Sequence, residues 1–178
     1  MNVLIVNAAD TKGGAAQVGY RLARSLHERG HGVCYLVGKQ FASDRFIERI
    51  NYAPSNPKAL PQRAIHRLGI NQLALDSRFP FQLGRDFLRQ FDVVHLHDLP
   101  TFNLLGFPWL TRLRPTVWTL HTLAPFTGNC LYPYDCERWK HRCGRCPQFG
   151  QFPLIGLRRD ASGFNLWAKR WVYRVIPI

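Results

Sequence analysis

Residues 2–7 read Asn-Val-Leu-Ile-Val-Asn, and this short stretch decides the fold. Its apolar residues, Val3 to Val6, form a continuous run, which is typical of a strand buried on both faces of a parallel sheet. The sequence Lys12-Gly13-Gly14 follows shortly afterwards and interrupts the pattern, as glycines do in a loop. A buried strand that leads into a glycine loop indicates an α/β protein.

A helix and a second strand are predicted after the glycine loop. The apolar residues recur with the spacing of a helix that packs on a sheet: Ala15, Val18, Leu22 and Leu26. Gly30 ends this pattern, and residues 31–37 supply the second strand. The three segments form a βαβ unit, whose crossover we expect to be right-handed.

Two further buried strands are indicated at residues 92–97 and 116–121. Each of them ends in a histidine, His97 and His121. In open α/β sheets, ligands bind at the carboxyl edge of the strands. We therefore expect these histidines near a ligand.

Other segments give weaker signals. We expect a short strand at 46–50, a short helix at 61–68, mixed helix and loop at 69–91, an irregular loop at 122–156, a basic aromatic helix at 163–174 and the start of a strand at 175–178. A domain that stops where a strand begins is interpreted as a fragment. The whole chain of 178 residues is long enough for one compact α/β domain.

Composition and charge limit the classes of protein that remain. The apolar fraction of 46 % is ordinary for a globular core. The net charge of +13 attracts anions such as nucleic acid, an acidic membrane face or phosphorylated substrates. No apolar run approaches the length of about 18 residues that a membrane span needs, and no signal peptide is recognisable, which favours a cytoplasmic protein.

Three functional classes fit poorly. Nucleic-acid binding is disfavoured because the basic residues are scattered rather than clustered, although a zinc-containing nucleic-acid-binding protein is kept as a minor alternative. A nucleotide-dependent oxidoreductase would need the G-x-G-x-x-G fingerprint, which the loop lacks. A glycosidase would need two facing carboxylates, and no pair of acidic residues is convincing.

The glycine loop and the histidines are the first candidate site residues. Gly13 and Gly14 would let the backbone of the loop approach a phosphate at a helix N-terminus, although a tight turn without a ligand gives the same pattern. His95 and His97 lie on one face of a strand, where a metal would need a third ligand. We expect a structural hydrogen bond for His95, whereas His97 and His121 could contact substrate.

Four of the five cysteines form a cluster between residues 130 and 146. They are Cys130, Cys136, Cys143 and Cys146, and the last two belong to a Cys-Gly-Arg-Cys-Pro sequence with the shape of a zinc knuckle. Four thiolates could hold a structural zinc ion in a reducing compartment. A disulfide or redox pair and simple buried thiols remain alternatives. Cys34, alone on a predicted strand, is expected in the core.

The stretch from Trp118 to Pro147 resembles retaining GT-B glycosyltransferases of family four, in particular bacterial enzymes of exopolysaccharide and colanic-acid-type assembly. The resemblance rests on Trp-Thr-Leu-His-Thr-Leu-Ala-Pro-Phe-Thr-Gly-Asn-Cys at residues 118–130 and on the cysteine spacing that follows. Gly13-Gly14-Ala15-Ala16 and residues 92–97 occur in the order that the family shows. The resemblance covers essentially the whole chain.

This resemblance implies a Rossmann-like, mostly parallel sheet with flanking helices, as the amino-terminal, acceptor-side half of an enzyme with two such halves. The glycine loop would approach the donor diphosphate or the acceptor, and His121 would contact the transferred sugar. The implied partners are a nucleotide sugar and a saccharide or lipid-linked acceptor. The resemblance also implies that transfer retains the anomeric configuration and requires no metal cofactor for catalysis.

Two departures from the family pattern bear on activity. Thr122, a candidate substrate-binding residue, stands where the family commonly has aspartate, and the donor-binding half is absent from this sequence. We expect no turnover by this chain alone, and an inactive remnant that only binds is the alternative. The basic surplus fits a peripheral protein on the inner face of the plasma membrane, with residues 167–174 as a contact; a helix with a solvated basic face is the favoured interpretation of that segment.

Overall fold

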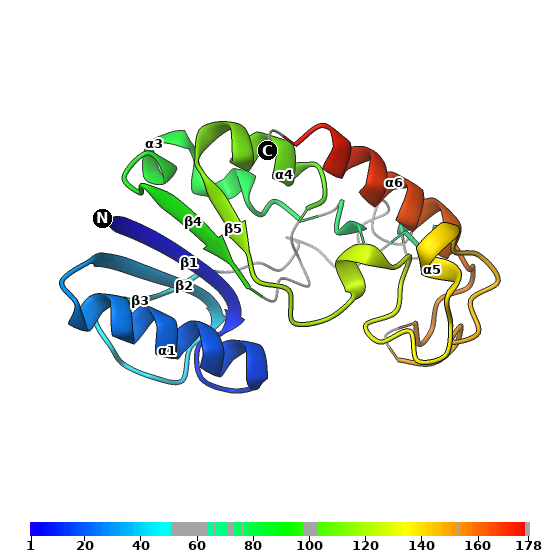
Figure 1. Cartoon of the computed structure of the whole chain (residues 1–178), viewed down its shortest axis with the longest axis horizontal. Helices are drawn as coiled ribbons and strands as arrows, with labels where there is room; N and C mark the ends of the chain where they lie inside the picture. Colours follow the sequence, from blue (N-terminus) through cyan, green and yellow to red (C-terminus); the bar gives the residue numbers. More distant parts are fainter. Residues whose placement is uncertain are drawn as a thin grey trace. The chain divides into compact units, whose positions relative to one another are not determined.

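The structure is a computed structural model (Figure 1). It describes residues 1–50, 64–65, 67–70, 73–75, 77–97, 103–152 and 154–176. In that part of the chain, no helix is both long enough and apolar enough to cross a membrane.

A parallel sheet of five strands forms the centre of the fold, in the order β3-β2-β1-β4-β5. The strands are β1 (Asn2–Ala9), β2 (Gly32–Lys39), β3 (Ile47–Arg49), β4 (Val93–Leu96) and β5 (Thr116–Trp118). All four neighbouring pairs run parallel. The predicted α/β class and Rossmann-like parallel sheet are therefore confirmed. The strand expected at 116–121 is shorter than predicted and ends at Trp118, although the Thr119 N–H still donates to the Leu96 carbonyl of β4 at 2.9 Å.

Helices flank the sheet or lie in the loops. They are α1 (Gly14–Glu28), α3 (Arg85–Leu88), α4 (Gly106–Leu113), α5 (Arg138–His141), α6 (Ser162–Arg174) and the short 3-10 helices η2 (Phe81–Leu83) and η3 (Ala124–Phe126). The helices expected after the glycine loop and at 163–174 are confirmed. Of the helix expected at 61–68, residues 64–65 and 67–68 are helical, and residues 61–63 and 66 lie outside the described part.

The strand expected at 175–178 is wrong for Val175 and Ile176. Val175 forms a turn at the end of α6, with its N–H donated to the Val172 carbonyl, and Ile176 forms a bend. Val175 is also 40 % exposed, so it lacks the burial that a strand in the sheet would give it. Residues 177–178 lie outside the described part.

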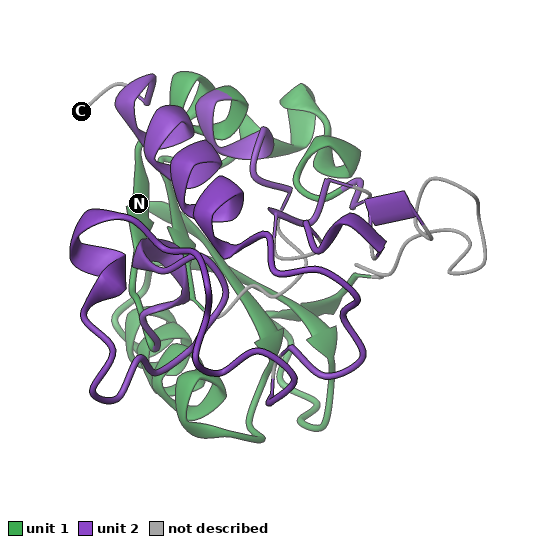
Figure 2. Cartoon of the chain, turned by 90° about the vertical axis from the view of Figure 1, so that its right-hand side faces the viewer, with its two compact units in different colours: residues 1–53, 79–101, 109–121 green, residues 54–78, 102–108, 122–178 purple. Residues whose placement is uncertain are grey.

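The chain divides into two compact units (Figure 2). Unit 1 comprises residues 1–53, 79–101 and 109–121, and unit 2 comprises residues 54–78, 102–108 and 122–178. Unit 1 contains the sheet, α1 and α3, whereas unit 2 contains η3, α5 and α6.

The core of unit 1 surrounds β1. Val3, Leu4, Ile5 and Val6 are all almost fully buried, as the apolar run predicted. Helix α1 packs on β1 and β2 (Figure 1). Leu22 and Leu26 pack against the core as predicted, but Val18 does not. Ala16, Gly19 and Ala23 are buried, whereas Val18 is 50 % exposed.

The close approach of α1 to the sheet explains this difference. A Cβ atom at Gly19 would lie 2.8 Å from both the Asn7 amide nitrogen and the Tyr35 hydroxyl, so only glycine lets the helix lie this close. The small residues face the sheet for that reason, and Val18 is turned toward solvent.

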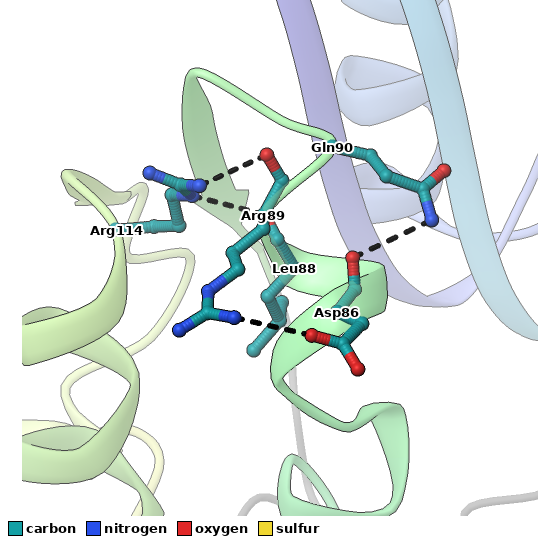
Figure 3. A network of polar contacts seen from close by, with 5 residues as sticks. All are labelled: Asp86, Leu88, Arg89, Gln90 and Arg114. Carbon is teal, nitrogen blue, oxygen red and sulfur yellow. Dashed lines mark hydrogen bonds and ion pairs between the residues drawn. The ribbon is translucent and has the colours of Figure 1, made fainter.

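Arg114 joins two segments of unit 1 beside α3 (Figure 3). Its Nε donates to the Leu88 carbonyl at 3.0 Å, and its Nη2 donates to the Arg89 carbonyl at 2.9 Å. These carbonyls are at the carboxyl end of α3, where carbonyls have no i+4 partner within the helix, and the Leu88 carbonyl also accepts the Phe91 N–H at 3.2 Å. Arg89 itself only pairs with Asp86 on the surface, at 3.2 Å. The half-buried Arg114 is therefore the stabilising member of this network.

Replacing Arg114 by alanine is expected to lower the free energy of unfolding by about 1–3 kcal/mol, because two carbonyls lose a charged donor. The matched control, Arg89→Ala, removes an exposed ion pair and should change stability within the error of the measurement. Urea unfolding followed by circular dichroism compares the two variants. Equal losses would show that Arg114 contributes no more than a surface charge.

Candidate functional site

The sheet has a topological switch point between β1 and β4. The chain passes from β1 to β2 on one side, and β4 pairs with β1 on the other side. Ligands in open α/β folds bind outside the carboxyl ends of the strands at such a point. The glycine loop follows β1, and His97 follows β4, so two of the predicted site segments flank the switch point.

The glycine loop has an open, strongly bent backbone. Gly13 has a φ of +107°, a conformation that glycine adopts without strain. A Cβ atom at Gly13 or Gly14 would meet nothing within 4 Å. Helix α1 begins at Gly14 without a side-chain cap and without an acidic residue in its first turn. Its amino-terminal N–H groups and the positive end of its dipole suit an anion.

Asp10 anchors this loop, and sequence reasoning missed it. Its buried carboxylate accepts the N–H groups of Thr11 at 2.6 Å, Phe41 at 2.6 Å and Ala42 at 2.7 Å. Burial raises the pKa of Asp10, but these hydrogen bonds outweigh it and leave the pKa below its ordinary value. In the sequence, the position of Asp10 directly after a buried strand is the feature that could have identified it.

The three histidines form one stacked cluster in unit 1. The rings of His95 and His97 stack with their centroids 4.5 Å apart, and His97 and His121 stack at 5.2 Å. His95 Nε2 is 2.7 Å from the Thr119 hydroxyl, in agreement with the hydrogen bond expected for it. His97 Nδ1 lies 2.9 Å from His121 Nε2. The structure thus brings His97 and His121 together.

Burial favours the neutral form of His95 and His97. His97 is 1 % exposed, and burial, followed by the nearby His95 and His121, lowers its pKa to about 4. Burial and then the charge of His121 also lower the pKa of His95. Neutral imidazoles can only share one proton across the 2.9 Å contact, so one ring donates and the other accepts.

The tautomer of His97 follows from its second nitrogen. Its Nε2 is buried and has no hydrogen-bond partner among the described residues. An orphaned N–H in the interior is rarer than an orphaned acceptor, which favours the proton on Nδ1 of His97. His97 then donates to His121 Nε2, and His121 carries its own proton on Nδ1, where the half-buried ring could donate to a ligand.

Thr122 has a local structural contact. Its hydroxyl accepts the Ala124 N–H at 3.3 Å, at the start of η3. The substrate contacts of Gly13, Gly14, His97, His121 and Thr122 all stay predictions. No group of three or more His, Cys, Asp or Glu side chains in the described part could hold a metal ion, and this includes His95 with His97. Asp98, the neighbouring carboxylate, lies outside that part.

The four clustered cysteines lie together in unit 2. They line one small cavity of about 20 Å³: Cys130, Cys136, Cys143 and Cys146. All five cysteines are free thiols, so the disulfide alternative is not seen, and Cys34 is buried as predicted. The thiols do not form a coordination group, and the structure therefore gives no support to the structural zinc expected here.

A buried lysine lies beside the thiols. Lys169 is 5 % exposed, which corrects its expected place on a solvated basic face, whereas Arg170 and Arg174 are exposed. Its Nζ donates to the carbonyls of Ala124 at 2.9 Å and Thr127 at 3.1 Å. Burial lowers the pKa of Lys169 to about 8, and the nearby Cys143 and Cys130 act against this effect. In the sequence, Lys169 is three residues from both Leu166 and Val172, and this helical spacing could have predicted that it lies on the buried face of α6.

The parallel sheet and its switch point, with a glycine loop on one strand and histidines on the next, define a Rossmann-like domain, and the GT-B class of glycosyltransferases is built from domains of this kind. The chain belongs to Glycosyltransferase Family 4, whose family model matches residues 12–176. It is also 28 % identical, over 193 aligned positions, to WcaC of Escherichia coli (strain K12), a protein named for glycosyl transfer in colanic acid biosynthesis. That match covers 98 % of this chain and 46 % of WcaC, so the chain spans about half the length of this curated relative.

The buried His97 predicts how stability depends on pH. The unfolded chain binds a proton at His97 near the ordinary pKa of 6.5, and the folded chain only near 4. Between these values the unfolded state holds more protons, so the free energy of unfolding should fall by up to about 3 kcal/mol as the pH is lowered.

Urea unfolding at several pH values from 4 to 7 measures this effect. His97→Asn should show a shallower fall, and the control His27→Asn, which removes an exposed imidazole, should retain the full fall. If His97→Asn and the unsubstituted chain lose stability in parallel, the buried histidine is not the cause.

Proposed function

We propose that this chain is the acceptor-side half of a retaining glycosyltransferase. The enzyme would move a glycosyl unit from a nucleotide sugar to a saccharide or lipid-linked acceptor in bacterial surface polysaccharide synthesis. The observation that carries the proposal is the placement of the glycine loop and His97 at the switch point, with His121 bonded to His97, in a member of family 4. The named role of WcaC in colanic acid biosynthesis supports the polysaccharide context.

Each predicted residue has a role in this proposal. Gly13 and Gly14 let the backbone and the amino end of α1 approach the donor diphosphate or the acceptor. His121 donates a hydrogen bond to the transferred sugar, and His97 holds the His121 ring in the donating tautomer. Thr122 contacts substrate from the following turn. No metal cofactor is required for catalysis, since neutral hydrogen-bond donors and the helix dipole stabilise the negative charge of the donor diphosphate.

The donor site would belong to a second half that follows this sequence. WcaC is about twice as long as the aligned chain, which supports this division. Without contacts to the donor, the transition state cannot be bound more tightly than the ground state, so the chain alone would not turn over. A remnant that only binds its ligand is the alternative. Sequencing the coding DNA beyond Ile178 distinguishes the two.

The net charge of +13 supports peripheral binding to acidic lipid on the cytoplasmic face of the membrane. There the enzyme would meet a lipid-linked acceptor and a soluble nucleotide sugar. Vesicle binding, included in the experiment of the next subsection, tests this placement.

We also propose that the cysteine cluster binds one structural zinc ion. A cavity of about 20 Å³ has room for a single water or ion, and four thiols line it. The Gly128 and Gln148 N–H groups bond the Cys143 and Cys146 thiols, as backbone groups do around thiolates. The buried Lys169 amine could balance the negative charge of a zinc–thiolate group. The side chains would have to turn toward the ion.

The activity proposal predicts the behaviour of the longer protein. If translation continues past Ile178 into a donor-binding half, that protein should transfer radiolabelled sugar to a lipid-linked acceptor, and the chain of residues 1–178 should not. His121→Ala should lower kcat by about 100-fold, because a positioned donor to the substrate is lost. His31→Ala is the control. Transfer by the isolated chain, or full activity in His121→Ala, would contradict the proposal.

Zinc binding predicts a measurable metal content. The chain purified without chelators should contain one zinc ion per molecule by mass spectrometry, and Cys143→Ser should lose it because a closed tetrahedral site needs all four thiolates. Cys34→Ser, which changes a cysteine outside the cluster, should keep the zinc. A substoichiometric content in the unsubstituted chain would leave simple buried thiols as the interpretation.

A further inference from the structure

Unit 2 contains a wide cavity along helix α6, apart from the predicted sugar-transfer residues. Its volume is about 650 Å³, within the range of natural ligand pockets. Phe164, Trp167 and Trp171 line it. They lie one helical turn apart, so their side chains project from one side of α6.

The aromatic side chains on this side of α6 are not part of the buried packing of the helix. Asn165, Leu166, Lys169 and Val172 form the opposite side and are buried. The three aromatic residues, by contrast, are 50 %, 61 % and 53 % exposed. Clustered exposed aromatic side chains are typical of surfaces that bind another molecule.

Arginines give the cavity its positive charge. Arg142, Arg170 and Arg174 line it, and Arg170 is committed to the wall, since it donates to the carbonyls of Trp139, Lys140 and His141. The exposed Arg142 and Arg174 side chains have no hydrogen bond or ion pair within the described part.

One carboxylate, Asp160, also lines the cavity and offsets one of the three arginine charges, so the net charge of the lining stays positive. Asp160 already accepts the N–H groups of Cys146 at 2.6 Å and of Ser162 at 2.9 Å. The charge of the cavity is therefore complementary to an anion, which Arg142 and Arg174 are available to bind.

We propose that this cavity binds a segment of acidic saccharide, with sugar rings stacked on the aromatic side chains and carboxylates paired with Arg142 and Arg174. The inference rests on the proposed function and specifies the class of its acceptor. Pyranose rings present apolar faces that pack on indole and phenyl rings, and guanidinium groups bind carboxylates in a bidentate manner. The site would hold a part of the acceptor away from the transferred sugar.

Two other occupants fit less well. From Phe164 to Arg174 the helix rises by about 15 Å, which matches a linear series of rings better than the single base of a nucleotide. A membrane surface is flat, whereas the aromatic and basic residues here line a hollow. A linear chain of charged sugars fits both the length and the concave form.

Calorimetry with defined probes tests the proposal on the chain of residues 1–178. The probes are a hyaluronan tetrasaccharide as the acidic ligand, chitotetraose as its neutral counterpart, UDP, and vesicles with or without phosphatidylglycerol. The variants are Trp167→Ala with Trp171→Ala, and Arg142→Gln with Arg174→Gln. The control, Arg21→Gln with Arg29→Gln, removes the same charge from an exposed position on α1 and from the exposed residue that directly follows it. All substituted side chains are exposed, and circular dichroism checks folding.

The acidic tetrasaccharide should bind at least about tenfold more tightly than chitotetraose. Each cavity double variant should weaken it by about tenfold or more, and the α1 control should not. Only the loss in the arginine variant should depend on salt, because charge pairs are screened.

Several results would overturn the proposal: equal binding of the acidic and neutral probes, equal losses in the control, or no binding. UDP binding or vesicle binding that disappears in the tryptophan variant would assign the cavity to a nucleotide or to a membrane. Vesicle binding that all variants retain would support the separate membrane proposal. The saccharide measurements alone would then decide the proposal for the cavity.

The transfer assay separates this inference from the proposed function. Sugar transfer by the longer protein without saccharide binding at α6 would overturn the inference alone. Saccharide binding at α6 without any transfer would overturn the proposed function and leave a saccharide-binding domain.

Discussion

Strand β1 is held by hydrogen bonds along both edges and is buried on both faces, and the geometry of the site depends on this position. Val3 pairs with Val33 of β2 and with Val93 of β4, and Val6 pairs with Leu36 and Leu96 in the same register. A shift by one residue would turn every buried side chain of the strand to the opposite face. The register therefore fixes where β1 and β4 end, and with them the positions of the glycine loop and His97.

The parallel sheet could be predicted because fully buried strands leave a plain record in sequence. The runs at 2–7, 31–37 and 92–97 are apolar for the same reason, since both faces of each strand are covered. The close approach of α1 to the sheet could not be predicted in this way. Gly19 contributes no hydrophobic signal, yet its lack of a side chain sets how closely the helix approaches Tyr35.

The candidate site, too, could be predicted in part from the sequence. That His97 and His121 would both lie at the carboxyl edge followed from strand pattern alone. Their ring-to-ring hydrogen bond depends on the ordering of β4 beside β5, which a single sequence does not contain. Asp10 was missed because its partners, Phe41 and Ala42, are about thirty positions away. Lys169 was predicted on the solvated face because of its charge, although its helical spacing from Leu166 and Val172 places it on the buried face.

The division of unit 2 into three separate stretches of sequence has a consequence for how the protein is made. Its segments 54–78 and 102–108 leave the ribosome well before 122–178, and Asn165 of α6 donates to the Gly69 carbonyl across this interval. The earlier segments must wait for α6 before their contacts are complete. During synthesis, the sheet of unit 1 has all its strands once residue 118 has emerged, whereas unit 2 can close only after α6 has emerged. Neither unit can be obtained as one uninterrupted piece of the gene.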